Sequence, residues 1–347
     1  MSLSKICWDV NHRRFAVKLT PGKLAGLQNV SNERGVIAAA AMDQRGSLKK
    51  ALGANAGDKE LIEFKIAVSD VLTKYASAIL LDPEWGLPAA AKRQKSAGLL
   101  LAYEKTGYDK QTPGRLPDLL DVWSAKRLKE AGADCVKILL YYAPSDPKKI
   151  NDHKHAWTER IGDECKANDI PFFLEIIGYE EGLDEKGLEY AKKKPEIVKA
   201  YMREFTKPQY GVDVLKLEVP INMKFVEGTK SFKGQKAYTS DEAMNHFRES
   251  AKCTNLPFIY LSAGVSNAEF AETLDLVAQS GVKYNGVLCG RATWADGVPI
   301  YAEKGLKAFE EWLNNEGVKN IQNVNKSLEH ASSWHSIYGV AEPVGAR

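Results

Sequence analysis

Short runs of β-branched and apolar residues recur along the chain, and segments with room for helices separate them. Eight of these runs have the length and composition of buried β-strands, and they begin at Gly35, Ser77, Gly98, Asp134, Pro171, Val212, Pro257 and Tyr284. Eight β–α units in one chain favour an α/β fold of the (β/α)8 TIM-barrel type. An open doubly wound sheet is the alternative, because a hydrophobic pattern alone does not show closure.

Two of the intervening segments have helical periodicity. Val122, Ala125, Leu128 and Ala131 recur at the spacing of one helix face. Residues 268–282 form a second such segment, in which Gly281 is predicted to be the C-cap. Between the sixth and seventh strands, residues 228–241 combine Gly, Ser and Lys, and we expect a mobile loop there.

The chain has no low-complexity linker that would divide it into separate domains. Its 347 residues, 44% hydrophobic and 27% charged, are sufficient for one large barrel. We therefore expect an N-terminal extension (residues 1–34), a barrel (35–310) and a C-terminal helical tail (311–347) packed on the barrel.

Charge and cysteine content exclude several classes of protein. The 48 Lys+Arg and 45 Asp+Glu residues are dispersed, so no basic tract indicates nucleic-acid binding. No apolar run approaches the roughly 20 residues that span a bilayer, and the N-terminus lacks the apolar core of a signal peptide. The five cysteines show no CxxC spacing, which argues against disulfides or structural zinc and favours the cytoplasm. The helix faces leave open whether the chain forms a homo-oligomer.

A lysine interrupts the buried strand VDVLKLEVP. If Leu215 and Leu217 face the outer helices, Lys216 and Glu218 point into the barrel, because side chains alternate along a strand. One interpretation is a structural Lys216–Glu218 ion pair. The other is a Schiff-base lysine, which burial and a neighbouring cation would keep neutral and nucleophilic.

Two further charged residues lie inside predicted strands. Lys137 is the candidate for the neighbouring cation, and the alternative is a salt bridge with Glu175 or Asp43. The apolar stretch FFLEIIGY surrounds Glu175, so we expect a raised pKa suited to proton transfer. A structural partnership with one of the lysines is the competing interpretation.

The ends of the seventh and eighth strands carry the residues expected of a phosphate site. They are Ser262, Ala263 and Gly264 after one strand, and Cys289, Gly290 and Arg291 after the other. Barrels bind phosphate in this region through backbone N–H groups and a cation, and an arginine offers a bidentate fork. Glycines after strands commonly form ordinary turns. The presence of Arg291 is what favours a phosphate site here.

Other motifs give little support to other chemistry. His153 and His155 form an HxH pair in a polar connecting segment with no obvious third ligand, so a solvated loop is favoured over a metal site. No GxGxxG or GxxxxGK[ST] motif follows the first strand, so those kinds of nucleotide binding receive no support.

With these residues in place, the chain resembles the class I tagatose-1,6-bisphosphate aldolases of the LacD type. The resemblance extends from about Gly35 to Glu316 and rests on long stretches such as AMDQRGSLKK, SAILLDPEWGLPA, GVDVLKLEVPINM and GVLCGRATWA. It implies a (β/α)8 barrel and a lysine Schiff base, with no metal or other cofactor. Residues 1–34 and the tail after about Lys319 match less well.

The resemblance also implies roles for individual residues. Lys216 matches the Schiff-base lysine, Glu175 the proton-transfer carboxylate and Lys137 the second lysine. The remaining matches are substrate-binding positions: Asp43, Gln44, Ser262, Gly264, Gly290 and Arg291.

The expected function is cleavage of a ketohexose 1,6-bisphosphate, a phosphorylated ketose, to dihydroxyacetone phosphate and glyceraldehyde 3-phosphate. Two alternatives stay open. One is the same chemistry on sulfofructose phosphate, which relatives on this scaffold cleave. The other is a non-catalytic regulatory protein that binds a metabolite.

Overall fold

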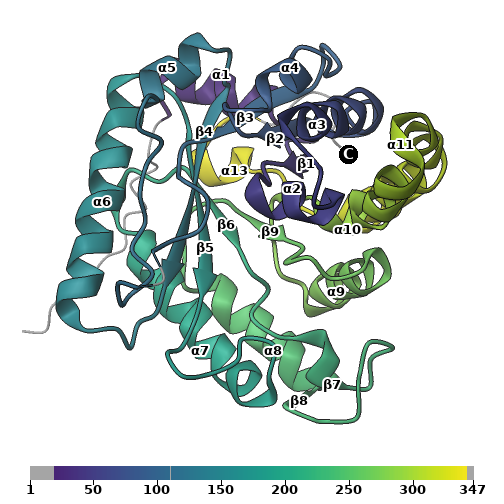
Figure 1. The fold of residues 1–347 in the computed structure, drawn as a ribbon. Coiled ribbons are helices and arrows are strands. Elements are labelled where there is room, and N and C mark those ends of the chain that lie inside the picture. Colours follow the sequence, from purple (N-terminus) through teal and green to yellow (C-terminus); the bar gives the residue numbers. More distant parts are fainter. Residues whose placement is uncertain (1–18, 110, 342–347) are drawn as a thin grey trace, which may run out of the picture.

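The computed structural model describes residues 19–109 and 111–341, and within these ranges eight parallel strands close into a barrel (Figure 1). Around the ring the order is β1-β10-β9-β6-β5-β4-β3-β2. The strands are β1 (Ile37–Met42), β2 (Ala78–Leu81), β3 (Gly98–Ala102), β4 (Cys135–Tyr142), β5 (Phe172–Gly178), β6 (Val214–Leu217), β9 (Phe258–Leu261) and β10 (Gly286–Cys289). All eight predicted strands and the closed barrel are confirmed.

Helices surround the strands (Figure 1). They are α2 (Gly46–Leu52), α3 (Asp58–Leu72), α4 (Leu87–Ala90), α5 (Ala125–Glu130), α6 (Lys148–Ala167), α7 (Leu188–Phe205), α8 (Ser240–Ala251), α9 (Asn267–Ser280), α10 (Arg291–Trp294) and α11 (Val298–Trp312). A π-helical turn (Leu313–Gly317) joins α11 to α12 (Val318–Ser327), and 3₁₀ turns lie at Pro208–Tyr210, Met223–Phe225, Ala295–Gly297 and Leu328–His330. No helix in the described ranges is long and apolar enough to cross a membrane.

Alternation along the strands separates an outer apolar layer from a barrel interior. In β6, Leu215 and Leu217 pack in the layer beneath the helices, whereas Val214 packs in the interior with Phe173 and Ile259. The same alternation applies in β4 and β5. The period of two therefore directs Lys137, Glu175 and Lys216 inward.

Two short segments close the end of the barrel where the strands begin. In α1 (Pro21–Asn29), Leu27 packs into the interior with Trp334 and Tyr338, and Lys23 Nζ lies 2.7 Å from Asp213 Oδ2. Tyr338, at the end of α13 (His335–Tyr338), donates a 2.6 Å hydrogen bond to the Asp213 carbonyl. Segments from both ends of the described chain thus seal one end of the barrel.

The two predicted helices differ in outcome. Gly281 is the C-cap of α9, with φ 77°, as predicted. The helix expected from Val122 begins only at Ala125, because the Ser124 hydroxyl accepts from Arg127 N and caps the first turn. Val122 precedes this cap and is 67% exposed, so it does not belong to the helix face.

Two segments predicted as loops contain regular structure. His153 and His155 lie within α6, and His155 packs against Phe205 while its Nε2 lies 3.0 Å from the Tyr142 hydroxyl. The expected solvated loop is therefore wrong there, because neighbouring aromatic residues bury one face of that segment. Residues 228–241 include strand β8 (Tyr238–Thr239), which pairs with β7 (Val226–Glu227). The mobility of that segment stays a prediction.

Candidate active site

A buried lysine stands at the centre of a cluster of carboxylates inside the barrel. Lys137 Nζ lies 2.9 Å from Asp43 Oδ2, 2.8 Å from Glu104 Oε1 and 2.8 Å from Glu175 Oε2. Asp43 follows β1, Glu104 follows β3 and Glu175 belongs to β5. Two strand ends and the middle of a third strand thus place three acidic side chains around one ammonium group.

Glu175 links this lysine to a second one. Its Oε2 lies 2.8 Å from Lys216 Nζ as well as from Lys137 Nζ. Glu175 and Lys216 are partners across the β5–β6 ladder, which fixes their separation. Lys216 is only 4% exposed. The structure therefore brings together Lys137, Glu175 and Lys216, and adds Asp43 to them.

The carboxylates and lysines stabilise one another's charged forms. Burial alone would lower the pKa of Lys137, but Asp43, Glu104 and Glu175 outweigh it and raise that pKa well above its usual range. Burial would raise the pKa of Asp43, but Lys137 and Lys216 lower it strongly. Lys137 is consequently a fixed cation beside Lys216.

The expected direction of the Glu175 pKa was wrong. Burial does act to raise it, as the apolar sequence around this residue indicated. Lys137 and Lys216 outweigh burial, and the pKa lies below its usual value. The local sequence contains neither cation, so the sign of the shift could not be inferred from it.

Glu218 does not share the site with Lys216. Its Oε2 accepts a 2.7 Å hydrogen bond from Gly178 N, and its Oε1 lies 3.2 Å from Lys194 Nζ of α7. The strand β6 ends at Leu217, so the alternation used to place Glu218 inside the barrel stops one residue earlier. The predicted inward orientation and the Lys216–Glu218 pair are both wrong.

Glu104 was missed from the sequence. It ends the stretch GLLLAYE, so the rule that selected polar residues at strand ends would have found it. Its Oε1 binds Lys137, while its Oε2 is buried and has no hydrogen-bond partner among the described residues. An unpaired buried carboxylate oxygen is costly unless a proton or a ligand satisfies it.

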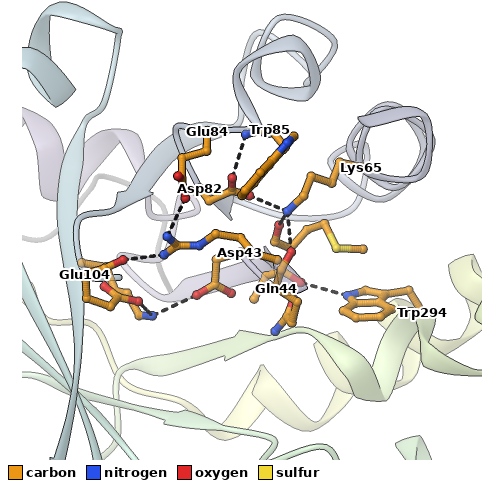
Figure 2. Close-up of polar contacts among 12 residues, drawn as sticks. Asp43, Gln44, Lys65, Asp82, Glu84, Trp85, Glu104 and Trp294 are labelled. Atoms are coloured by element: carbon orange, nitrogen blue, oxygen red, sulfur yellow. Dashed lines mark hydrogen bonds and ion pairs between the residues drawn. The ribbon is translucent and has the colours of Figure 1, made fainter. Parts of the chain in front are cut away.

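A buried network holds the turn after β1, as Figure 2 shows. Lys65 Nζ donates to the carbonyls of Met42 (2.7 Å) and Gln44 (2.8 Å), and it lies 2.5 Å from Asp82 Oδ1. Trp85 N donates to the other Asp82 oxygen. These bonds fix the backbone on both sides of Asp43 and so orient its carboxylate toward Lys137.

Two further residues complete the surroundings of this turn. Arg45 donates to Glu84 Oε2 (2.9 Å) and to the Glu104 carbonyl (2.6 Å), which ties the β1 turn to the segment after β3. Gln44 is half-buried, and its Oε1 has no hydrogen-bond partner within the described chain. This oxygen is itself buried, so the Gln44 side chain carries a buried acceptor without a donor.

The predicted phosphate-binding residues also meet. The Arg291 guanidinium lies over Gly264, where an added Cβ would come within 2.6 Å of its Cζ. Ala263 and Gly264 have φ 51° and 77°, a left-handed turn that exposes backbone N–H groups. Ser262 is buried and Arg291 is exposed. Gly290 packs against the Ala41 carbonyl, where a Cβ would lie at 2.8 Å.

The described residues offer no group of three His, Cys, Asp or Glu side chains that could hold a metal ion. The acidic groups of the site instead surround a lysine.

Two buried lysines inside a (β/α)8 barrel, with an exposed arginine and turn N–H groups at the ends of β9 and β10, fit an enzyme of the aldolase class. The chain belongs to the DeoC/LacD family of aldolases, whose family description matches residues 37–296. The predicted membership of an aldolase family, and with it the prediction of a lyase, is confirmed.

Curated relatives match over nearly the whole chain. A protein of Listeria monocytogenes serotype 4a named tagatose 1,6-diphosphate aldolase is 55% identical, covering 94% of this chain and 98% of its own. Tagatose 1,6-diphosphate aldolase 2 of Enterococcus faecalis is 54% identical, and the match covers 93% of this chain and 99% of the relative. The tagatose 1,6-diphosphate aldolase of Staphylococcus aureus strain JH9 is 51% identical, and the match covers 90% of this chain and 97% of the relative.

A solved structure shares the fold. Fructose-bisphosphate aldolase from Plasmodium falciparum aligns with a TM-score of 0.62 and 16% identity, covering 93% of this chain and 96% of that one. At this identity the comparison supports the barrel architecture alone.

Proposed function

We propose that this protein is a class I aldolase that cleaves tagatose 1,6-bisphosphate to dihydroxyacetone phosphate and glyceraldehyde 3-phosphate. One observation carries the proposal: Lys216 lies in the barrel interior within 2.8 Å of a carboxylate that it shares with a second lysine. The names of the curated relatives favour a ketose bisphosphate over a sulfosugar phosphate. The scattered cysteines, of which the four in the described ranges are free, favour a cytoplasmic location.

The first chemical stage is formation of an imine. Lys216 gives a proton to Glu175, and its neutral amine attacks the C2 carbonyl of the ketose. The C2 oxygen takes one proton back from Glu175 and a second from the attacking nitrogen, and it leaves as water to give a protonated imine. Lys137 remains charged through these steps and keeps Glu175 paired.

The second stage is cleavage of the C3–C4 bond. A carboxylate accepts the proton of the C4 hydroxyl, the C4–O bond becomes a carbonyl, and the C3–C4 electrons move into the iminium to form an enamine. Asp43, Glu104 and Glu175, which surround Lys137, are the candidates for this base. The carboxylic acid then gives its proton to C3 of the enamine, and hydrolysis of the resulting protonated imine releases dihydroxyacetone phosphate and restores Lys216.

The remaining predicted residues bind the substrate. Arg291 and the turn N–H groups near Gly264 and Gly290 hold the phosphate next to C2. They lie at the end of β9, which pairs with β6, and at the end of β10, which is the next strand along the ring. Ser262 adds a hydroxyl to this anchor. Gln44 lies next to Asp43, and its buried side-chain oxygen lacks a donor that a substrate hydroxyl would supply.

Borohydride reduction with dihydroxyacetone phosphate, followed by peptide mapping, tests the proposal. We expect a stable adduct on Lys216, and none in Lys216→Ala. Lys194→Ala is a matched control, because Lys194 pairs with Glu218 outside the barrel interior. An adduct on another lysine, or no adduct with the wild-type protein, would contradict the proposed mechanism.

A further inference from the structure

An arginine and two tyrosines meet at the open end of the barrel, outside the residues described so far. We call Tyr108, Arg115 and Tyr141 the rim cluster. Tyr108 and Arg115 belong to the segment after β3, and Tyr141 lies near the end of β4, four residues beyond Lys137. Because side chains alternate, Tyr141 and Lys137 share the inner face of β4. The rim cluster therefore lies directly beyond the lysines, toward solvent.

Arg115 has hydrogen-bond donors to spare. Its Nη2 lies 2.6 Å from Glu185 Oε1, and its Cζ lies 4.1 Å from the ring centre of Tyr179 and 5.2 Å from that of Tyr108. A guanidinium has five N–H donors, and no hydrogen bond to any other described residue occupies the rest. The side chain is 18% exposed, so it is accessible while aromatic rings fix its position.

The two tyrosines offer hydroxyl groups at the same place. Their ring centres are 4.8 Å apart in an edge-to-face arrangement. Neither hydroxyl hydrogen-bonds to another residue in the described part of the chain, and both side chains are half-buried. Burial and then Tyr108 and Glu175 raise the pKa of Tyr141, while Arg115 and Lys137 oppose the rise. Tyr141 is thus within electrostatic reach of both the lysine pair and Arg115.

The strand order places the rim cluster opposite the predicted phosphate site. In the closed ring β1-β10-β9-β6-β5-β4-β3-β2, four steps separate β4 from β10 and four separate β3 from β9. Lys216 on β6 lies between these two sides. A ketose that is bound to Lys216 and anchored beside Arg291 therefore extends its far end across the opening, toward the ends of β3 and β4.

We propose that the rim cluster is the subsite for the second phosphate of the substrate, the one at the aldehyde end of the ketose bisphosphate. Arg115 supplies the charge and two N–H donors, and the hydroxyls of Tyr108 and Tyr141 donate to the remaining phosphate oxygens. Glu185, an exposed carboxylate, holds the guanidinium in place before the substrate arrives. This inference rests on the proposed function, because it assumes a bisphosphate bonded to Lys216.

A purely structural role for Arg115 predicts a different result. Arg115 joins the segment after β3 to Tyr179 and Glu185 after β5, so its loss could loosen both segments. That disturbance would impair every substrate alike. A phosphate subsite affects only a substrate with the second phosphate, so the ratio between two substrates separates the roles.

The experiment compares cleavage of tagatose 1,6-bisphosphate and tagatose 1-phosphate. We expect Arg115→Gln to lower kcat/KM about 100-fold for the bisphosphate and by less than about threefold for the monophosphate. Tyr141→Phe should lower the bisphosphate value about tenfold, and Arg115→Lys should restore part of the preference. Lys105→Gln is the matched control, since Lys105 is paired with Asp118 and Asp121 after the same strand and should leave the preference unchanged.

The outcomes separate the inference from the function on which it rests. Equal losses for both substrates in Arg115→Gln, or an unchanged preference, would overturn the subsite while leaving the aldolase intact. A loss of the borohydride adduct with dihydroxyacetone phosphate in Arg115→Gln would mean that the rim cluster binds the opposite phosphate, and would also overturn it. A wild-type protein that cleaves neither compound would overturn the proposed function and this inference together.

Discussion

Both ends of the barrel contain buried lysines paired with carboxylates, but the two arrangements differ in balance. At the end sealed by α1, Lys23 faces Asp213. At the open end, Lys137 and Lys216 face Asp43, Glu104 and Glu175. A buried ion pair by itself therefore does not indicate function in this molecule. The useful distinction is whether the groups satisfy one another.

At the sealed end, Lys23 and Asp213 satisfy each other's charge and hydrogen-bonding groups. Lys23 Nζ lies 3.0 and 2.7 Å from the two Asp213 oxygens, and the nearer of these oxygens also accepts from Phe172 N at 2.8 Å. One positive charge meets one negative charge, and both carboxylate oxygens have donors. Such a pair joins α1 to the start of β6 and has no capacity left for a ligand.

The lysine cluster at the open end has more carboxylates than lysines, and one carboxylate oxygen is unpaired. Two lysines face three carboxylates, and Glu104 Oε2 has no partner within the described chain. Burying such groups destabilises a protein unless a proton or a ligand compensates. The imbalance thus marks the end of the barrel where chemistry is expected.

Removing the proposed nucleophile should give the largest effect. Lys216→Ala is expected to lower kcat by about 10⁴-fold or more, because the imine can no longer form. Circular dichroism should still report a folded barrel. Residual cleavage above about a hundredth of the wild-type rate would assign the imine to another residue.

The same kind of change at the sealed end should affect stability instead. Lys23→Met leaves Asp213 buried without its cation and should lower the free energy of unfolding by about 3–5 kcal/mol. Urea denaturation at pH 7 measures this, while kcat/KM in the absence of urea should stay within about threefold of wild type. If Lys23→Met kept normal stability and lost activity, the sealed end would not have the purely structural role described here.

Glu104→Gln tests the unpaired oxygen. The change keeps the shape and the contact with Lys137 but removes a charge, and we expect kcat for cleavage to fall about 30- to 100-fold. The borohydride adduct on Lys216 should still form. Glu218→Gln is the matched control, since that carboxylate bonds to Lys194 and Gly178 outside the site, and its cleavage rate should be nearly unchanged.

The smallest effect concerns pH. The pKa of Asp43 is lowered in the folded protein, since Lys137 and Lys216 outweigh burial, so its ionised form stabilises the fold above the ordinary value of 3.8. This stabilisation disappears as the pH falls below that value. The difference in unfolding free energy between wild type and Asp43→Asn should therefore shrink by about 1–2 kcal/mol between pH 6 and pH 3.

Asp213→Asn provides the contrasting measurement. Burial outweighs Lys23 there and raises the pKa of Asp213, so its contribution to stability is present at low pH and declines as the pH rises. The pH dependence for the two variants should have opposite signs. Equal signs would show that the two ends do not differ electrostatically in the manner described.

The sequence alone predicted the barrel strands and the inward orientation of Lys137, Glu175 and Lys216. Both predictions depend on a period of two within a continuous strand. Prediction failed where that period no longer applied. Glu218 lies one residue beyond β6, so its direction depends on α7 and not on the strand. The sign of the Glu175 pKa depends on two cations contributed by other strands, and no local sequence reveals their summed effect.

The seal at the closed end has a consequence for synthesis of the protein. Trp334 Nε1 donates a hydrogen bond to Ser31 Oγ, which lies 303 positions earlier in the chain. Both residues adjoin the segments that close the sealed end of the barrel. During translation this contact cannot form until Trp334 has left the ribosome. Until then, the strands made earlier lack this part of the seal at the closed end of the barrel.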